Sequence, residues 1–294
     1  MSSPISHYVA YLRPLTFVPT FFLALTGYAL SPARPRAAAH IAVDLALLFA
    51  VQSVLLWGGA NAFNSSQDRD SGPVNLLPSP PPMPEHLAAF GLFANGAAIV
   101  LAATRGLWAA LIVTAGVAAS TFYSWQSGHW RRGKEIGVVD NLINAAGSGA
   151  GSILLGYAFT NAPLGWHVVL IAAAFTVATF GGAPTSQIFQ LRPQDRYVDA
   201  RNYTSLLGAK TTLRLGALLF GAHVALVAAL GLPAGAVEVA LWLGWAALAL
   251  AASAHSWLWS KSPFVEPYQK MTRQFAMIMT SQTLWTGYAW YATS

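Results

Sequence analysis

Long apolar stretches separated by short polar loops recur along the whole chain of 294 residues. A helix needs about 20 mostly apolar residues to cross a bilayer, and this pattern predicts nine such helices. Their expected ranges are 14–31, 42–63, 86–104, 106–124, 138–160, 165–187, 212–230, 236–254 and 272–292. The sequence therefore predicts an all-α integral membrane protein with about nine transmembrane helices.

Small residues inside these stretches indicate close helix packing. The segment Gly147-Ser-Gly-Ala-Gly151 places small residues four apart, a spacing that lets helix backbones approach each other in membranes. A proline cluster at 78–84 falls inside one polar loop, and no linker rich in proline, glycine or serine divides the chain. We therefore expect one domain, a single bundle over residues 1–294.

Composition leads to the same class of protein. Hydrophobic residues make up 55% of the chain and charged residues 9%, whereas soluble domains carry about a quarter charged residues. A lipid bilayer must therefore cover much of the surface. The chain has no cysteine, which excludes disulfides, thiolate metal sites and cysteine nucleophiles. The stretch 1–14 lacks the basic residues and apolar core of a cleavable signal.

The distribution of basic residues predicts the orientation in the membrane. If nine helices alternate, the N-terminus and the loops after helices 2, 4, 6 and 8 share one side. That side carries 13 of the 16 lysines and arginines, and the other side keeps Arg34, Arg36 and Arg105. By the positive-inside rule the richer side is cytoplasmic. We therefore expect a cell-membrane protein, with any active site formed by these loops facing the cytoplasm. A net charge of +6 confined to one side does not indicate nucleic-acid binding.

Two acidic segments follow the second and sixth predicted helices, on the cytoplasmic side. Asn64 and Asp68 are four residues apart, as are Asp195 and Asp199, so each pair shares a face if the helix continues. Carboxylates cost about 2.5–3.5 kcal/mol each at a membrane centre, and hard oxygen ligands suit Mg²⁺. We predict these four residues as magnesium ligands, while Asp70 serves a second metal or caps the loop.

An alternative interpretation is that these acids pair with neighbouring arginines in a solvated loop, namely Arg69, Arg196 and Arg201. The loop after the fourth predicted helix supplies further cations, and these suit the oxygens of a diphosphate as well as marking the cytoplasmic side. The candidates for binding a diphosphate are Arg132, Lys134, Arg131, Arg201 and Arg69.

Aromatic residues flank the same segments and predict part of a substrate cavity. Tyr123, Phe63 and Phe189 present ring faces that stabilise a carbocation when they lie close to it. Arg13 is a weaker candidate for the same cavity or for an interfacial anchor. The seven histidines show no metal-binding spacing.

These residues together resemble the UbiA-type intramembrane prenyltransferases, over almost the whole chain. The family's first motif is Asn-Asp-x-x-Asp-x-x-x-Asp, and its second is Asp-x-x-x-Asp followed by an arginine and a later glycine. The residues that carry the resemblance are Arg13-Pro-Leu-Thr16, Asn64, Asp68, Tyr123-Ser124, Arg132-Gly-Lys134, Asp195, Arg201 and Gly208. The departures are Ser65 and Gly72 in the first motif, where Asp70 replaces the missing acid, and Leu191, Asp199 and Asn202 in or after the second.

The resemblance implies Mg²⁺-dependent transfer of a prenyl group from an isoprenoid diphosphate to a small-molecule acceptor, often aromatic, inside a membrane-embedded central cavity. Asp68, Asp195 and Lys134 would then carry the catalysis. A terpene cyclase of the same superfamily needs no acceptor and is the alternative enzyme. A transporter or ion-binding protein is the non-enzymatic alternative, because acids inside membranes also mark ion paths. The acceptor, the prenyl chain length and the oligomeric state stay open.

Overall fold

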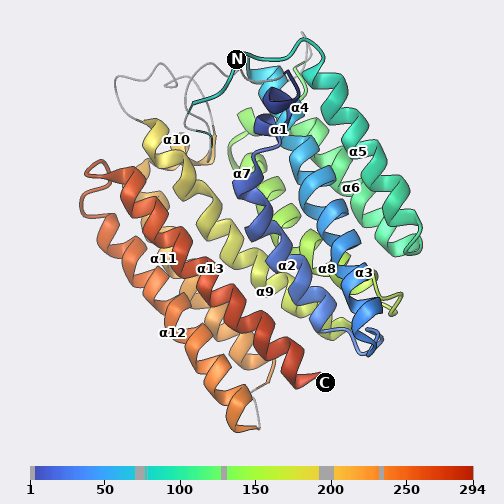
Figure 1. The fold of residues 1–294 in the computed structure, drawn as a ribbon. Helices are drawn as coiled ribbons and strands as arrows, with labels where there is room; N and C mark the ends of the chain where they lie inside the picture. The colour runs from blue at the N-terminus through green and yellow to red at the C-terminus, as the bar shows by residue number, and fades with distance from the viewer. Residues whose placement is uncertain are drawn as a thin grey trace. The chain divides into compact units, whose positions relative to one another are not determined.

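The computed structural model describes residues 4–69, 77, 79–126, 131–191, 202–231 and 235–293, which form helices joined by loops (Figure 1). The chain divides into two compact units. The first comprises Met1–Arg132 and Gly151–Leu164, and the second comprises Gly133–Ala150 and Gly165–Ser294.

The first unit contains one long continuous helical stretch, Ala38–Asp68, which changes helix type along its length. The elements of the first unit, in chain order, are α1 (Pro4–Tyr11), η1 (Pro14–Thr16), α2 (Phe17–Ala29), α3 (Ala38–Phe49), η2 (Ala50–Gly58), α4 (Gly59–Asp68), α5 (Leu87–Ala103), α6 (Leu107–Ser124) and α8 (Ser152–Ala158). The segment η2 is a π-helix, a rare form that is frequent at functional sites. Its polar side chains bond to neighbouring helices: Ser53 Oγ donates to Phe17 O at 3.0 Å, and Gln52 Nε2 donates to Ser152 Oγ at 2.7 Å.

Glycines bring α2 and α8 into direct backbone contact. A Cβ atom added to Gly27 would overlap the carbonyl oxygen of Ile153, and one added to Gly156 would overlap that of Ala24. In membranes, where burial gives helices little driving force to associate, such close approach supplies the packing energy. The spacing of small residues along these two helices therefore decides how tightly they pack.

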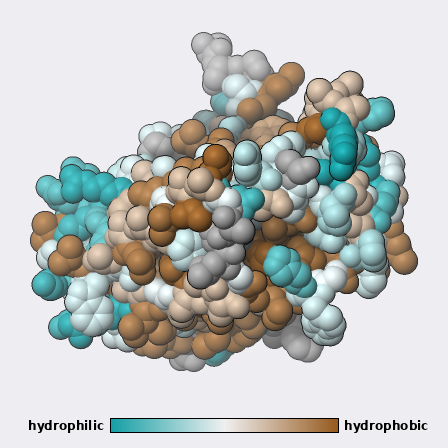
Figure 2. All heavy atoms as spheres, turned by 90° about the horizontal axis from the view of Figure 1, so that it is seen from below, coloured by the Kyte–Doolittle hydropathy of each residue, from teal (hydrophilic) through white to brown (hydrophobic). Residues whose placement is uncertain are grey.

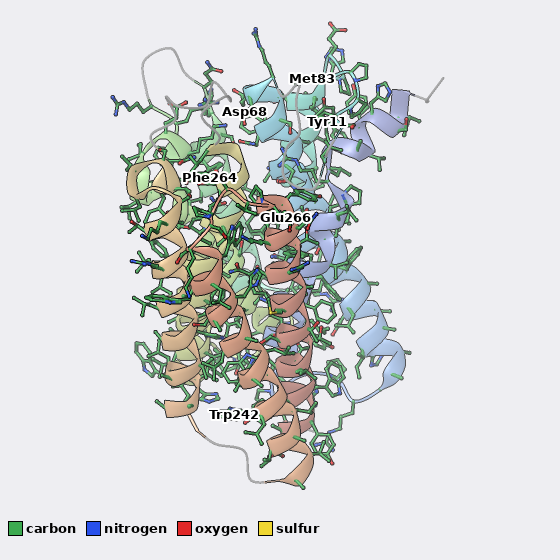
Figure 3. The ribbon with its side chains drawn as sticks, turned by 90° about the vertical axis from the view of Figure 1, so that its left-hand side faces the viewer. Tyr11, Asp68, Met83, Trp242, Phe264 and Glu266 are labelled. Carbon is green, nitrogen blue, oxygen red and sulfur yellow. The ribbon has the colours of Figure 1, made fainter. Side chains whose placement is uncertain are left out.

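An apolar cluster closes the end of the first unit at which α4 ends. Tyr11, Leu12, Ala62 and Leu87 are buried there, with Met83 packed against them. The Tyr11 hydroxyl donates to the carbonyl oxygen of Pro81 at 2.7 Å, which ties residues 79–86 to the end of α1. Figure 3 shows Tyr11, Met83 and Asp68 at this same end.

The second unit is built around an aromatic core. Its elements are η3 (Gly133–Glu135), α7 (Gly137–Ala146), η4 (Gly147–Gly151, whose last residue belongs to the first unit), α9 (Trp166–Gly182), η5 (Ala183–Leu191), α10 (Tyr203–Leu207), α11 (Ala209–Ala229), α12 (Ala236–Trp259) and α13 (Pro267–Ala292). The His223 ring lies 4.6 Å from that of Phe175 and 5.4 Å from that of Trp245, measured between centroids. Trp242 on α12 lies at one end of this unit, and Phe264 and Glu266 in the loop after α12 lie at the other (Figure 3).

The positions and the apolar character of the helices agree with the prediction of a membrane protein. All nine predicted ranges coincide with helical segments, and six helical stretches of the described residues are long and apolar enough to cross a membrane. Large apolar side chains face outward, among them Phe93 at 77% and Trp166 at 82% exposure. Hydrophobic residues cover much of the face seen in Figure 2. These features point to a multi-pass membrane protein, while the count of nine spans in one bundle stays a prediction.

Candidate functional site

The first pair of predicted metal ligands, Asn64 and Asp68, lies at the end of α4. The helix ends at Asp68 because Arg69 adopts a left-handed backbone conformation (φ 53°), and the Arg69 N–H donates to Ser65 O at 3.0 Å. Asn64 Nδ2 donates to Asp68 Oδ2 at 3.1 Å. The two side chains therefore share one helical face, as their four-residue spacing predicts.

Asp68 joins three separate segments of the first unit. Arg132 Nη1 donates to Asp68 Oδ1 at 2.7 Å, and the two side chains are only 18% and 16% exposed. Ser124 Oγ donates to Asn64 Oδ1 at 3.0 Å. The end of α4 thus contacts the end of α6 through Asn64 and the basic loop through Asp68, although Arg132 follows Asp68 by 64 residues. An arginine does pair with this acid, but it comes from the basic loop instead of the neighbouring position 69.

A second guanidinium approaches the same helix. Arg13 is 7% exposed, and its Nη2 donates to Ser65 Oγ at 2.8 Å. Its backbone is left-handed (φ 54°) at the start of η1, and Asn61 Nδ2 donates to the carbonyl oxygen of Leu12 at 3.3 Å. Ser65, which stands where the resembled motif has an acid, therefore accepts a bond from a buried arginine.

The side-chain oxygens of Asn64 and Asp68 on α4 are of the kind that binds a magnesium ion. Mg²⁺ takes one or two carboxylate ligands and fills its remaining positions with water and phosphate oxygens. Asp68 supplies two carboxylate oxygens and Asn64 an amide oxygen, and Asp68 Oδ1 already accepts from a cation. Nowhere in the described parts of the chain do three His, Cys, Asp or Glu side chains come together as a metal-binding group. One helix therefore offers only part of a coordination shell.

The other predicted site residues are distributed as follows. Lys134 lies in η3 of the second unit and is half-buried, whereas Arg131 is exposed. Tyr123 is half-buried on α6, and Phe63 is 5% exposed and packs against Gly91 of α5. Asp70, Asp195, Asp199, Arg201 and the side chain of Phe189 lie outside the described residues.

Sequence reasoning missed a buried carboxylate in the second unit. Asp140 on α7 is 1% exposed, and Gln187 Nε2 donates to its Oδ2 at 3.1 Å. A signal for it was present, because Asp140 is the single acid within the predicted span 138–160 and acids inside membrane helices are candidate functional residues. Its partner Gln187 lies 47 residues away, and no spacing pattern reveals such a pair.

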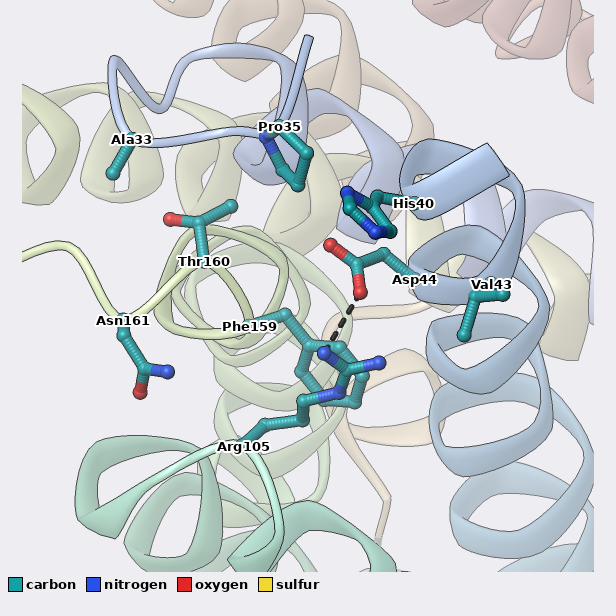
Figure 4. Close-up of a pocket in the computed structure, with 9 residues that line it drawn as sticks. All are labelled: Ala33, Pro35, His40, Val43, Asp44, Arg105, Phe159, Thr160 and Asn161. Atoms are coloured by element: carbon teal, nitrogen blue, oxygen red, sulfur yellow. Dashed lines mark ion pairs between the residues drawn. The ribbon is translucent and has the colours of Figure 1, made fainter. Parts of the chain in front are cut away.

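A pocket of about 340 Å³ lies elsewhere in the first unit (Figure 4). Asp44 and Arg105 pair across it at 2.8 Å, and the Tyr28 hydroxyl donates to the second Asp44 oxygen at 3.0 Å. Asp44 and Asp68 are 24 positions apart in one helical stretch, which puts them about 36 Å apart at 1.5 Å per residue. This pocket is therefore separate from Asn64 and Asp68. Its ion pair joins α3 to the turn before α6, and the Tyr28 bond adds α2.

The chain matches the UbiA prenyltransferase family over residues 17–281. It belongs to this family. A structure of digeranylgeranylglyceryl phosphate synthase is similar to the chain at 14% identity, with 98% of this chain and 99% of that one covered and a TM-score of 0.68. A UbiA homologue from Archaeoglobus fulgidus bound to GPP and Mg²⁺ gives 16% identity, the same coverage and the same TM-score. No curated protein matches the chain.

A further UbiA homologue, from Aeropyrum pernix K1, shares 18% identity over 92% of this chain and 96% of its own, with a TM-score of 0.62. At these identities the likeness shows the fold alone. The UbiA family assignment confirms the resemblance on which the sequence interpretation relied, and it confirms the all-helical class.

Proposed function

We propose that the protein transfers a prenyl group from an allylic isoprenoid diphosphate to a small-molecule acceptor, with magnesium bound at the end of α4. The observation that carries this proposal is the network of Asn64, Asp68 and Arg132. It combines hard oxygen ligands for a divalent cation with a guanidinium suited to phosphate oxygens. Family membership and a fold shared with homologues bound to GPP or DMAPP and Mg²⁺ support it.

The reaction breaks the bond between C1 of the prenyl chain and the diphosphate oxygen, and both bonding electrons leave with the diphosphate. Arg132 would stabilise the charge that develops on the departing group, as preorganised donors do for transition states. Bound magnesium would supply further positive charge to the same oxygens. An electron-rich atom of the acceptor then bonds to C1, and the acceptor gives up a proton.

The sequence extends this proposal to residues beyond the network. Asp195 and Asp199 are predicted to bind metal, with Asp70 as a further ligand, and Lys134 is predicted to contact the diphosphate. The division of basic residues predicts that these loops face the cytoplasm. We further propose that residues 1–294 form one functional prenyltransferase domain.

The test is an incubation of the purified full chain in lipid nanodiscs with Mg²⁺ and allylic diphosphates of five to twenty carbons, with and without aromatic acceptors. Diphosphate release that requires an acceptor, together with a prenylated product, supports the transferase. Release with a terpene as sole product identifies a cyclase instead. An absence of release with every donor refutes both enzymes and favours an ion-binding or transport role. The Asp68→Ala protein serves as the inactive control.

A further inference from the structure

The first unit has a pocket far from Asp68 that the proposed reaction does not use. Its volume of about 340 Å³ falls within the range of about 300–1,000 Å³ that is typical of small-molecule sites. Its polar lining comes from the turn before α6, from α3 and from the turn after α8, namely Arg105, His40, Asp44, Thr160 and Asn161 (Figure 4). Polar groups from three separate segments therefore face one hollow, which we call the Arg105 pocket.

Arg105 is held in place by contacts that use only part of its hydrogen-bonding capacity. Its Nη1 lies 2.8 Å from Asp44 Oδ1, and its guanidinium carbon lies 5.9 Å from the centroid of the Phe159 ring. A guanidinium carries five N–H donors, and Asp44 is its one side-chain partner in the part of the chain that the structure describes. The arginine is therefore fixed in position and keeps donors for a ligand.

Positive charge is in excess around the Arg105 pocket. Pro35 also lines it, and Arg34 and Arg36 stand on either side of this proline in the sequence. Three arginines thus lie in or beside the pocket with one carboxylate, that of Asp44, whose second oxygen already accepts from the Tyr28 hydroxyl at 3.0 Å. Burial lowers the pKa of Arg34, and the positive charge of Arg36 lowers it further. An anion bound here would relieve this repulsion.

Contacts within the protein account for only two of the three arginines. Arg34 donates to the carbonyl oxygen of Ala29, the last residue of α2, and a cation is favourable at the C-terminus of a helix. Arg105 pairs with Asp44. Arg36 is exposed and lies on the side of the membrane that the predicted topology leaves poor in basic residues. A negatively charged ligand gives all three arginines a common partner.

The surroundings of the Arg105 pocket favour a lipid as the source of that anion. Val43, which lines the pocket, has an exposed side chain. Leu107 and Trp108 follow Arg105 in the sequence and are also exposed, and tryptophan is enriched where a membrane meets water. A lipid phosphate in the pocket would leave its acyl chains beside these apolar side chains, whereas free phosphate would make no use of them.

We propose that the Arg105 pocket binds the phosphate of an anionic phospholipid in the membrane leaflet away from the cytoplasm. The open N–H groups of Arg105 donate to the phosphate oxygens, and Arg34 and Arg36 supply positive charge at the rim. This inference does not depend on the proposed function. A purely structural role for the arginines predicts instead that their replacement lowers thermal stability and leaves lipid binding by the folded protein unchanged.

The experiment is native mass spectrometry of the purified full chain in a neutral detergent, titrated with phosphatidylglycerol or with phosphatidylcholine. The wild type should bind the anionic lipid about fivefold more tightly, as expected for one additional charge near basic residues. Equal affinities for the two lipids would overturn the inference. Inorganic phosphate is added as a competitor, and displacement of phosphatidylglycerol at equal concentrations would assign the pocket to free phosphate and overturn the lipid.

Three variants test the pocket without leaving Asp44 unpaired. Arg36→Gln removes an exposed charge and should weaken phosphatidylglycerol binding about fivefold. Arg105→Lys keeps a cation beside Asp44 but loses the planar fork of donors, and it should weaken binding about tenfold. Asp44→Asn keeps an oxygen acceptor for Arg105 and removes the negative charge, so it should bind phosphatidylglycerol more tightly than the wild type. Weaker binding by Asp44→Asn in folded protein contradicts the proposal.

Lys261→Gln is the matched control. Lys261 is exposed in the loop after α12, so this variant loses the same charge as Arg36→Gln on the predicted cytoplasmic side. It should bind phosphatidylglycerol as the wild type does. Equal affinities for wild type, Arg36→Gln and Arg105→Lys would overturn the inference, as would equal losses of affinity in Arg36→Gln and Lys261→Gln.

Discussion

Replacing Arg132 should strengthen metal binding when no diphosphate is present, although the change removes a residue that we place in the site. In the structure Arg132 Nη1 donates to Asp68 Oδ1 at 2.7 Å. A metal that binds Asp68 must displace this guanidinium or share the carboxylate with it. Arg132→Gln removes this competing cation from Asp68 Oδ1.

The magnitude follows from the burial of the pair. Both side chains are less than one-fifth exposed, so water screens the interaction only in part. Hydrogen bonds to charged groups contribute about 1.5–3 kcal/mol, which corresponds to a factor of about 10–100 in a binding constant. We expect Mn²⁺ to bind Arg132→Gln more tightly than wild type by up to that factor when diphosphate is absent.

The effect of Arg132→Gln on Mn²⁺ affinity should reverse in sign when diphosphate is added. The guanidinium then has phosphate oxygens to bind, so its loss should weaken the ternary complex instead of strengthening it. Electron paramagnetic resonance titrations with Mn²⁺, with and without inorganic diphosphate, measure both arms. Arg131→Gln removes an equal charge from the exposed neighbouring position and should change Mn²⁺ affinity without diphosphate by no more than about twofold, as expected for a solvated surface charge.

A weaker Mn²⁺ affinity for Arg132→Gln in the absence of diphosphate would refute the exchange of partners. Equal changes in Mn²⁺ affinity for Arg131→Gln and Arg132→Gln would show that the effect comes from net charge alone. Either result would make the ion pair at Asp68 a structural contact.

Three further predictions follow from the site and the topology. Asp68→Ala and Asp195→Ala should each lower diphosphate release at least 10²-fold in folded, extracted protein, because the loss of positioned electrostatic stabilisation typically costs 10²–10³ in rate; a variant that keeps a tenth of the activity contradicts a ligand role. Lys134→Ala should lower kcat/KM for the prenyl donor about 10–100-fold, with partial recovery in Lys134→Arg, and donor kinetics close to wild type would assign Lys134 to topology alone. Single cysteines that replace Arg131 and Arg36 should be labelled by an impermeant maleimide from opposite faces of the membrane, with position 131 labelled from the cytoplasm. Labelling of both positions from the same face would contradict the alternating topology.

The sequence predicted the helices because a membrane imposes the length of each apolar stretch. The ranges 86–104 and 106–124 agree with α5 and α6 to within three residues, since apolar composition alone marks their ends. The end of α4 was harder to place. Its last turns are polar, the helix runs on to Asp68, and Arg13 donates to Ser65 beside it. The short helix α1 was not predicted, although most of it belongs to the apolar stretch Ile5–Ala29.

Individual contacts within the site were predictable only between residues that are near neighbours in sequence. The shared face of Asn64 and Asp68 follows from helical geometry. The partners of these residues, Ser124 and Arg132, lie 60 and 64 positions away and are brought there by the packing of α4 against α6. Gln52 bonds to Ser152 across 100 residues, and one sequence carries no signal for such pairs.

The π-helical segment η2 places a constraint on the length of the chain that its composition does not reveal. It lies between α3 and α4 in one helical stretch, and each residue of an α-helix turns the chain by about 100°. Removing a single residue from 50–58, with the helix type unchanged, would leave every residue of the Asn64–Asp68 motif in place. It would nevertheless rotate that motif by roughly a quarter turn, away from Ser124 and Arg132. Natural variation in this stretch should therefore tolerate exchange of one apolar residue for another far better than insertion or deletion, and an engineer who shortens it should expect a folded helix with a misdirected carboxylate.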